Sequence, residues 1–150
     1  MKYSVFILAL CVSLLACKKD SSSSTTKTDE ISSADWRYDS GGIGDANGNI
    51  ITAFPSGTIP DCTLDNTIHF NSNGTGTVAE NANVCPGAPA TSTFTWSFLN
   101  NETVLNVSAG AVAGIGGNFK IKELTSTQFT LLKDTTVSGF AATAVVKLKH

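Results

Sequence analysis

Long apolar runs are nearly absent from this chain of 150 residues. The longest, at residues 3–16, is only fourteen residues long, and Lys18, Lys19 and Asp20 end it abruptly. A helix that crosses about 30 Å of hydrocarbon needs roughly 20 apolar residues. The sequence therefore excludes a transmembrane helix at this position, and the run needs another explanation.

Arginine and histidine are scarce as well. Arg37 is the only arginine, His69 and His150 are the only histidines, and the formal net charge is −2. Without a basic stripe, nucleic acid is excluded as an expected partner. Neither HxH nor HExxH occurs, and no nucleophile, base and orienting group can be named from their spacing. We therefore expect no catalytic residues, no metal site and no cofactor.

The apolar run has the features of a secretory signal, with Lys2 before it and small residues at its end. Its last residues, Leu14-Leu15-Ala16-Cys17, resemble the lipobox of bacterial lipoproteins. The resemblance implies that residues 1–16 are a signal peptide, that the mature chain begins at Cys17, and that Cys17 carries diacylglycerol and anchors the protein to a membrane. A second acyl chain makes such anchoring stable. The alternative is an ordinary cleaved signal that leaves Cys17 free.

The residues after the lipobox predict where the protein resides and where it folds. Lysines rather than aspartate follow Cys17, which resembles outer-membrane sorting in Gram-negative bacteria, facing either the periplasm or the cell surface. Residues 21–28 are rich in Ser and Thr and contain no apolar side chain, so we interpret residues 17–34 as a flexible tether. Residues 35–150 suffice for one domain with a hydrophobic core.

Apolar residues alternate with polar ones through almost all of this domain, and no long helical stripe occurs. In residues 91–99, Phe94, Trp96 and Phe98 share one strand face while small polar residues occupy the other. We predict an all-β chain whose strands lie near 36–42, 49–54, 67–71, 76–80, 91–99, 103–108, 117–124, 128–133 and 140–149. Short connections favour an up-and-down antiparallel meander that closes into a barrel of about eight strands. A two-sheet β-sandwich is the alternative.

Two cysteines remain in the exported domain, Cys62 and Cys85, and export permits their oxidation. A three-residue hairpin turn at 72–74 would pair Ile68 with Val78, and a two-residue turn at Asn73-Gly74 would shift the pairing by one residue. We favour the three-residue turn because it matches apolar residues better, and either turn leaves both cysteines at the same end of the hairpin. We predict a structural disulfide, which would stabilise the fold by roughly 3 kcal/mol on the chain-entropy model. The alternative is a redox-active pair.

Several motifs together resemble the lipocalin-like domain of bacterial surface and periplasmic lipoproteins. They are the lipobox, the Ser-rich tether, Trp36 in the first strand, "FTWSF", "FKIKELTSTQFTLLK", and the run of Cys62, Asp65, Asn66, Phe70 and Asn73-Gly74-Thr75. The resemblance covers roughly residues 35–135 and implies a lipocalin-like β-barrel. Many members of this family have no assigned ligand.

Three functions are compatible with such a barrel. In the first, a binding module, inward side chains line a site for a small apolar ligand: Phe70, Phe94, Trp96, Phe98, Phe119, Phe129 and Phe140. In the second, a structural or protein-interaction lipoprotein, the same side chains fill the interior. The third, an enzyme, needs a polar cleft that joins His69 to a carboxylate. We favour a non-catalytic binding module.

Two further segments are interpreted as loops. The sequence "DANGN" at 45–49 hints at a calcium loop, but Ile50 occupies the position that needs glycine, so we interpret it as a turn. The segment "SAGAVAGIGG" at 108–117 contains small and apolar residues. We expect a flexible rim there, with a cover over the barrel mouth or a membrane contact as the alternative.

Overall fold

The computed structural model describes residues 25–112 and 114–150, and the predicted signal peptide and lipidation site Cys17 lie outside the described residues. The elements are α1 (Lys27–Ser32), β1 (Trp36–Gly44), β2 (Ile50–Ala53), the 3-10 helix η1 (Asp61–Thr63), β3 (Thr67–Phe70), β4 (Thr75–Ala79), β5 (Thr91–Leu99), β6 (Val104–Val112), β7 (Ile115–Leu124), β8 (Gln128–Val137) and β9 (Phe140–Lys149). Among these residues, no helix has the length and apolar character needed to cross a membrane.

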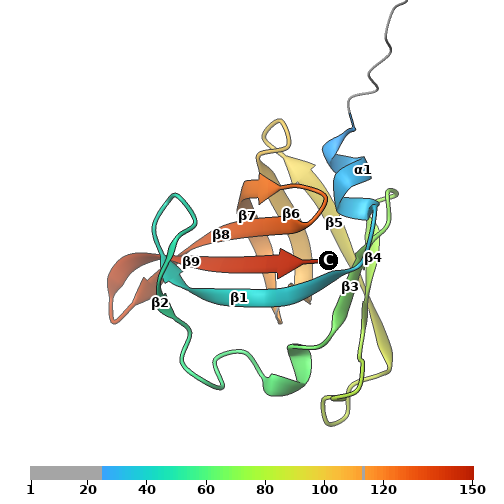
Figure 1. Cartoon of the computed structure of the whole chain (residues 1–150), viewed down its shortest axis with the longest axis horizontal. Helices are drawn as coiled ribbons and strands as arrows, with labels where there is room; N and C mark the ends of the chain where they lie inside the picture. Colours follow the sequence, from blue (N-terminus) through green and yellow to red (C-terminus); the bar gives the residue numbers. More distant parts are fainter. Residues whose placement is uncertain (1–24, 113) are drawn as a thin grey trace, which may run out of the picture.

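The strands form one antiparallel sheet that closes on itself (Figure 1). From β3 to β9 each strand pairs with the next along the chain, and β9 pairs with β1. The other edge of β1 pairs with β3 near its start and with β2 near its end. The predicted all-β, up-and-down meander is confirmed as an eight-stranded barrel with β2 as an additional strand, and the sandwich alternative is wrong.

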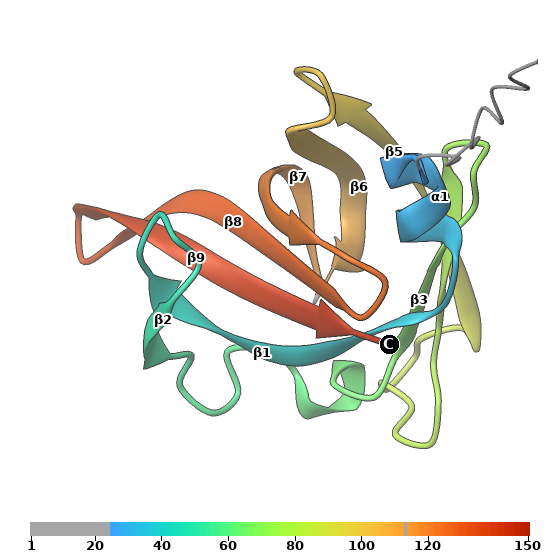
Figure 2. The ribbon, with the colours of Figure 1, turned by 45° about the horizontal axis from the view of Figure 1, so that its top comes forward.

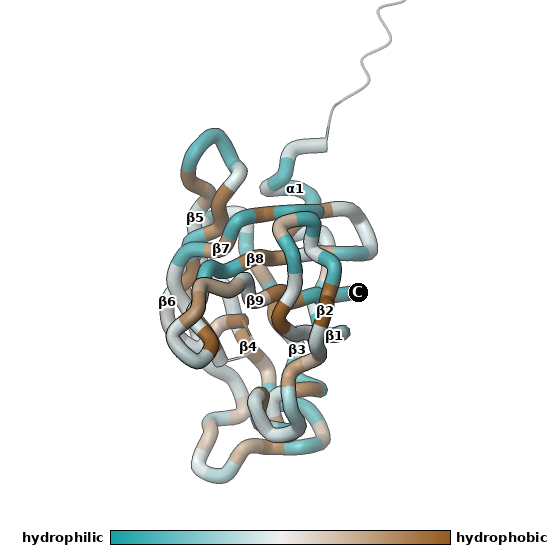
Figure 3. Tube along the Cα trace, turned by 90° about the vertical axis from the view of Figure 1, so that its left-hand side faces the viewer, coloured by the Kyte–Doolittle hydropathy of each residue, from teal (hydrophilic) through white to brown (hydrophobic). Residues whose placement is uncertain are grey.

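The alternation of side chains along the strands explains this closure. Apolar and polar residues are interspersed along the strands (Figure 3). Their alternation places most of the apolar side chains on one face of the sheet, and this face is buried when the sheet curls. Phe70 lies at the centre of the interior, with ring centroids 5.2 Å from Phe94, 5.6 Å from Trp96 and 6.4 Å from Phe129. These rings form the middle of one continuous core.

Helix α1 covers one end of the barrel, which we call the closed end (Figure 2). Thr26 caps the helix and forms a capping box with Asp29. Ile31 is fully buried, and its carbonyl oxygen accepts a hydrogen bond of 2.8 Å from Nε1 of buried Trp36. The folded domain therefore begins before Asp35, within the expected tether. The sequence pattern did not predict this helix because six residues with one buried apolar side chain show no helical periodicity.

The segment 108–117 is not the expected flexible rim, because β6 continues to Val112 and β7 begins at Ile115. Ala111 and Val112 are buried and belong to the core. The pairing of β6 with β7 is irregular between Val107 and Val112, which hides the two-residue period on which the sequence prediction depended.

Strands β8 and β9 extend beyond the barrel as a two-stranded projection, which we call the arm (residues 133–142; Figures 1 and 2). The prediction that Phe140 lines the interior is wrong, since this residue is 77% exposed. Val137 pairs with Phe140 at the arm's tip. Phe140 has the inward register of Leu148 and Val146, but the opposite barrel wall ends before the arm does. The alternation of apolar and polar residues correctly predicts which face of the strand Phe140 lies on. It cannot predict whether another strand of the barrel covers that face.

Candidate functional site

The end of the barrel opposite α1, which we call the mouth, contains a cavity of about 100 Å³. Apolar side chains of β3, β4 and β6 form its floor: Ile68, Val78 and Ala111. Polar side chains and backbone form the rest of its wall, namely Tyr38, Thr63, Asn66, Glu80, Ser92, Gly110 and Gly114. Ligand sites commonly combine an apolar floor with a few polar groups in this way.

Two donors hold the Glu80 carboxylate in the mouth wall. The Nδ2 amide of Asn66 donates to Oε1 at 2.7 Å, and the backbone N–H of Cys85 donates to Oε2 at 2.9 Å. Asn66 is only 6% exposed, and its Oδ1 has no donor within the described protein. The neighbouring Asp65 accepts from the backbone N–H of Asn83, while its Oδ1 is likewise buried without a donor. Asn66 and Asp65 therefore each keep one buried oxygen, Oδ1, that accepts no hydrogen bond from the described part of the protein.

A disulfide between Cys62 and Cys85 fixes the loop that carries this wall, with the two Cα atoms 5.0 Å apart. The predicted pairing is confirmed, and so is the predicted register, in which Ile68 lies opposite Val78. The bond joins η1 to the loop after β4, and Cys85 also donates to Glu80. The disulfide therefore supports the geometry of the mouth as well as the stability of the fold.

Tyr38 forms the rim of the mouth. It also lines an adjoining cavity of about 170 Å³ with Phe54 and Leu64. A Cβ on Gly41 would lie 2.8 Å from Cε2 of Phe54 and 2.9 Å from the hydroxyl of Tyr38, so only glycine leaves room for these rings. Burial, and then the charge of Asp39, raises the pKa of the Tyr38 phenol above its ordinary value.

The predicted interior residues lie in the core and not around the mouth cavity. Five of them point inward and are buried as predicted: Phe70, Phe94, Trp96, Phe119 and Phe129. Phe98 is partly buried beside Trp96, at a centroid distance of 5.3 Å. The Nε1 of Trp96 donates to the backbone oxygens of Asn71 and Thr75, which fixes this ring. Because the rings contact one another edge to face, they fill the middle of the barrel.

A family model for the lipocalin-like domain matches residues 18–131. The chain belongs to the lipocalin-like domain family. No curated protein sequence matches it significantly. The family match ends at residue 131, within β8. Strand β9 and the tip of the arm therefore lie beyond the matched residues.

The histidines of this lipocalin-like domain lie near its closed end. His69 points outward as predicted, and its Nδ1 forms an exposed hydrogen bond of 2.9 Å with a carboxylate oxygen of Asp35. The ring of His150 contacts Trp36 at a centroid distance of 3.9 Å, and burial lowers the pKa of His150. In residues 25–112 and 114–150, no three His, Cys, Asp or Glu side chains cluster closely enough to hold a metal ion.

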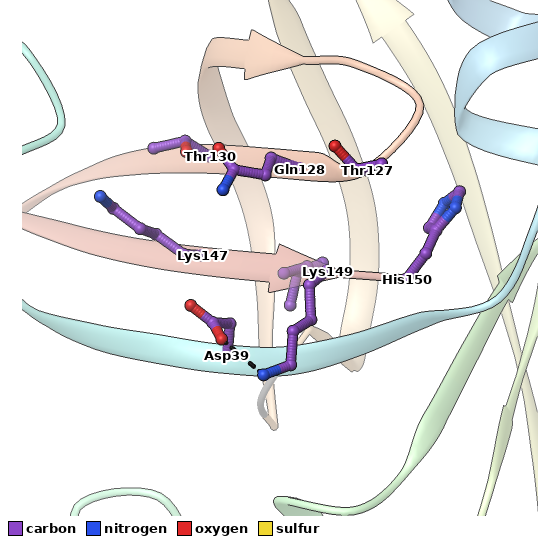
Figure 4. A pocket seen from close by; sticks show the side chains of 8 residues that line it. Asp39, Thr127, Gln128, Thr130, Lys147, Lys149 and His150 are labelled. Carbon is purple, nitrogen blue, oxygen red and sulfur yellow. Dashed lines mark ion pairs between the residues drawn. The ribbon is translucent and has the colours of Figure 1, made fainter.

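The outer surface of the lipocalin-like domain has an open polar groove of about 270 Å³ along β8 and β9 (Figure 4). Lys149 forms an ion pair of 2.7 Å with Asp39, and this hydrogen bond lowers the pKa of Asp39. Figure 4 shows Lys147 and Gln128 spread along the strands rather than directed at one point. The turn at 45–49 adjoins this surface, and Asp45 accepts from the backbone N–H of Asn47 and of Asn49 as a turn residue. The mouth is therefore the stronger candidate site.

Proposed function

We propose that this lipocalin-like domain is a non-catalytic binding module that a lipidated Cys17 holds at the outer membrane. Its ligand site is the mouth, where the apolar floor and the polar wall meet in one cavity. That combination is the observation on which the proposal depends, because it offers both burial of an apolar group and orientation by hydrogen bonds.

The size of the mouth limits the ligand. Phe70, Phe94 and Trp96 occupy the interior below it, so a ligand cannot pass deep into the barrel. A cavity of about 100 Å³ accepts a short alkyl group or one end of a longer molecule. The ligand therefore places a small apolar group against Ile68 and Val78 and leaves the remainder outside the rim.

The charge of the mouth limits the ligand further. Glu80 is the only ionisable carboxylate in the lining, and no Lys, Arg or His lies among the lining residues. An anionic head group would be repelled by Glu80 and would find no cation to pair with. Neutral or cationic compounds are therefore favoured over free carboxylates.

Ligand binding is tested with three compounds that share one short alkyl chain: an amine, an alcohol and a carboxylate. Binding to the full chain is followed through the NMR methyl signals of Ile68 and Val78, two lining residues that the variants below leave unchanged. We expect shifts with the amine or alcohol and their loss in Ala111→Leu, which fills the cavity. Ala141→Leu, an exposed alanine on the arm, is the matched control. If none of the compounds shifts these signals, the binding proposal fails.

Membrane anchoring is tested separately through the cysteines of the N-terminal segment. Cells that express the full chain are fed a radiolabelled fatty acid, and label on the protein is measured. We expect Cys17→Ser to abolish labelling and Cys11→Ser, which alters the other cysteine of that segment, to leave it intact. Equal labelling of both variants would contradict lipidation at Cys17.

The filled interior also supports a second candidate function, that of a structural or protein-interaction lipoprotein without a small ligand. The aromatic rings pack edge to face in the middle of the barrel, and the exposed arm offers a surface for association. The NMR titration separates the two functions, because a protein of this second kind gives no methyl shifts with any of the three compounds.

A further inference from the structure

The arm has unpaired backbone edges. The pairing of β7 with β8 ends at Lys120 and Leu132, and the pairing of β1 with β9 ends at Gly44 and Thr143. Beyond these positions β8 and β9 pair only with each other within the described part of the chain. Exposed strand edges are templates for pairing with another chain.

The two edges of the arm differ. On the β8 side, the Nζ of Lys133 donates to the carbonyl oxygen of Gly116, and Lys120 forms an ion pair with Asp134. These two links cross from β7 to β8 and obstruct the edge. In the described residues, no hydrogen bond or ion pair between side chains crosses the β9 edge at 140–142. The β9 edge is therefore the more accessible one.

The arm also carries the apolar face of the barrel into solvent. Val137 and Phe140 lie opposite each other at its tip, and both are exposed. From Thr135 to Val146 the sequence contains no charged residue and no proline. Natural edge strands are usually protected by lysine, proline or a covering element, and this edge has none of these within the segment. Its composition permits two such edges to meet without charge repulsion.

We propose that β9 of the arm pairs with β9 of a second copy of this chain, antiparallel and about a two-fold axis at Ala141. This register places Phe140 of one copy opposite Ala142 of the other, so a large side chain packs beside a small one. A second copy supplies both features that the arm needs, an open edge and an uncharged apolar face, and two-fold pairing uses the same surface on each copy. Because the interface is short, association is weak and depends on concentration.

Cross-linking of the full chain tests this pairing. Ala141→Cys places the new cysteines of two copies opposite each other, so mild oxidation is expected to give a disulfide-linked dimer on a non-reducing gel. Thr77→Cys is the matched control, because Thr77 is partly exposed on β4, whose neighbours β3 and β5 pair with it on both sides. We expect no dimer from this control.

A second pair of variants distinguishes pairing through the arm from non-specific association of exposed apolar residues. In the Ala141→Cys chain, Phe140→Asp brings like charges together and is expected to lower the dimer yield at least tenfold. Ile51 on β2 is 74% exposed, against 77% for Phe140. The control Ile51→Asp is expected to leave the dimer yield unchanged. The proposal is overturned by equal effects of these two variants, by a cross-linked product of another mass, or by the lack of a dimer from Ala141→Cys.

Discussion

The two ends of the barrel are built from the same alternating strands and differ in almost every other respect. At the closed end, α1 contacts both β3 and β7, and Trp36 and Ile31 are fully buried. At the mouth, the arm projects into solvent and a cavity lies open between β3, β4 and β6. Strand β9 passes through both regions, with Leu148 1% exposed and Phe140 77% exposed on the same register.

This difference teaches that an apolar strand face has no fixed role. Where opposite walls meet, the face forms the core and contributes to stability through burial. Where the walls diverge, the same face becomes available to a ligand or a partner. Stability is therefore concentrated near the closed end, and the surfaces suited to binding are concentrated at the mouth and on the arm.

The largest effect is expected from shortening Phe70, which lies at the centre of the aromatic cluster. Phe70→Ala should lower the free energy of unfolding by about 3–5 kcal/mol through lost burial and a residual cavity. Phe140→Ala is the comparison and should change it by no more than about 0.5 kcal/mol, as for other exposed sites. Urea denaturation followed by circular dichroism measures both, and similar losses would contradict the contrast between the two ends.

A smaller effect is expected from removing the disulfide at the mouth. The double variant Cys62→Ser/Cys85→Ser should lower the free energy of unfolding by about 2–4 kcal/mol. Because Cys85 also holds Glu80, this variant should in addition broaden the NMR signals of Ile68 and Val78. The methyl signals of Leu148, near the closed end, serve as the control and should remain sharp. Broadening at both ends would show that the mouth is not an independent region.

The hydrogen bond that seals the closed end is expected to contribute less. Trp36→Phe removes the donor to the carbonyl oxygen of Ile31 and leaves that buried acceptor without a partner. The unpaired group costs about 1–3 kcal/mol. Amide hydrogen exchange should then quicken in α1 more than in the hairpin of β3 and β4. Uniform quickening across the domain would show that α1 is not held locally by this bond.

The smallest effect is expected in the pH dependence of the free energy of unfolding, through His150 at the closed end. The pKa of His150 in the folded protein is lowered from 6.5, chiefly by burial, so folding favours the neutral ring. Its contribution to stability is therefore present above pH 6.5 and is lost as the pH falls through the folded pKa. Urea midpoints at pH 8 and pH 5.5 should show a small loss of stability in the native chain. His150→Gln should reduce this loss of stability. If the variant loses as much stability as the native chain, groups other than His150 cause the loss.

Much of the fold was predictable because it depends on local alternation. The strand at 91–99 and the register of Ile68 with Val78 were predicted from residue spacing and are confirmed. The link between Cys62 and Cys85 was predicted from their spacing and from the expected export of the chain, and it is confirmed too. The lipidation of Cys17 remains a prediction, since that residue lies outside the described residues.

The candidate site was not predictable to the same degree. Asn66 and Glu80 are fourteen residues apart and meet only because β3 pairs with β4 and the disulfide holds the loop beyond. The sequence analysis noted Asn66 as part of a family motif but missed Glu80. The one available signal was a carboxylate at the end of the predicted strand 76–80. The sequence analysis also placed Phe140 in the interior and Ile31 in the tether.

By itself the sequence determined the strands, their antiparallel order and which face of each strand is apolar, because a period of two is a property of neighbouring residues. Only the tertiary structure decided where along each strand that face is covered. Coverage depends on the lengths and tilt of strands far apart in the chain, which meet around the barrel axis. This is why Leu148 is buried in the core while Phe140 lies on the open surface.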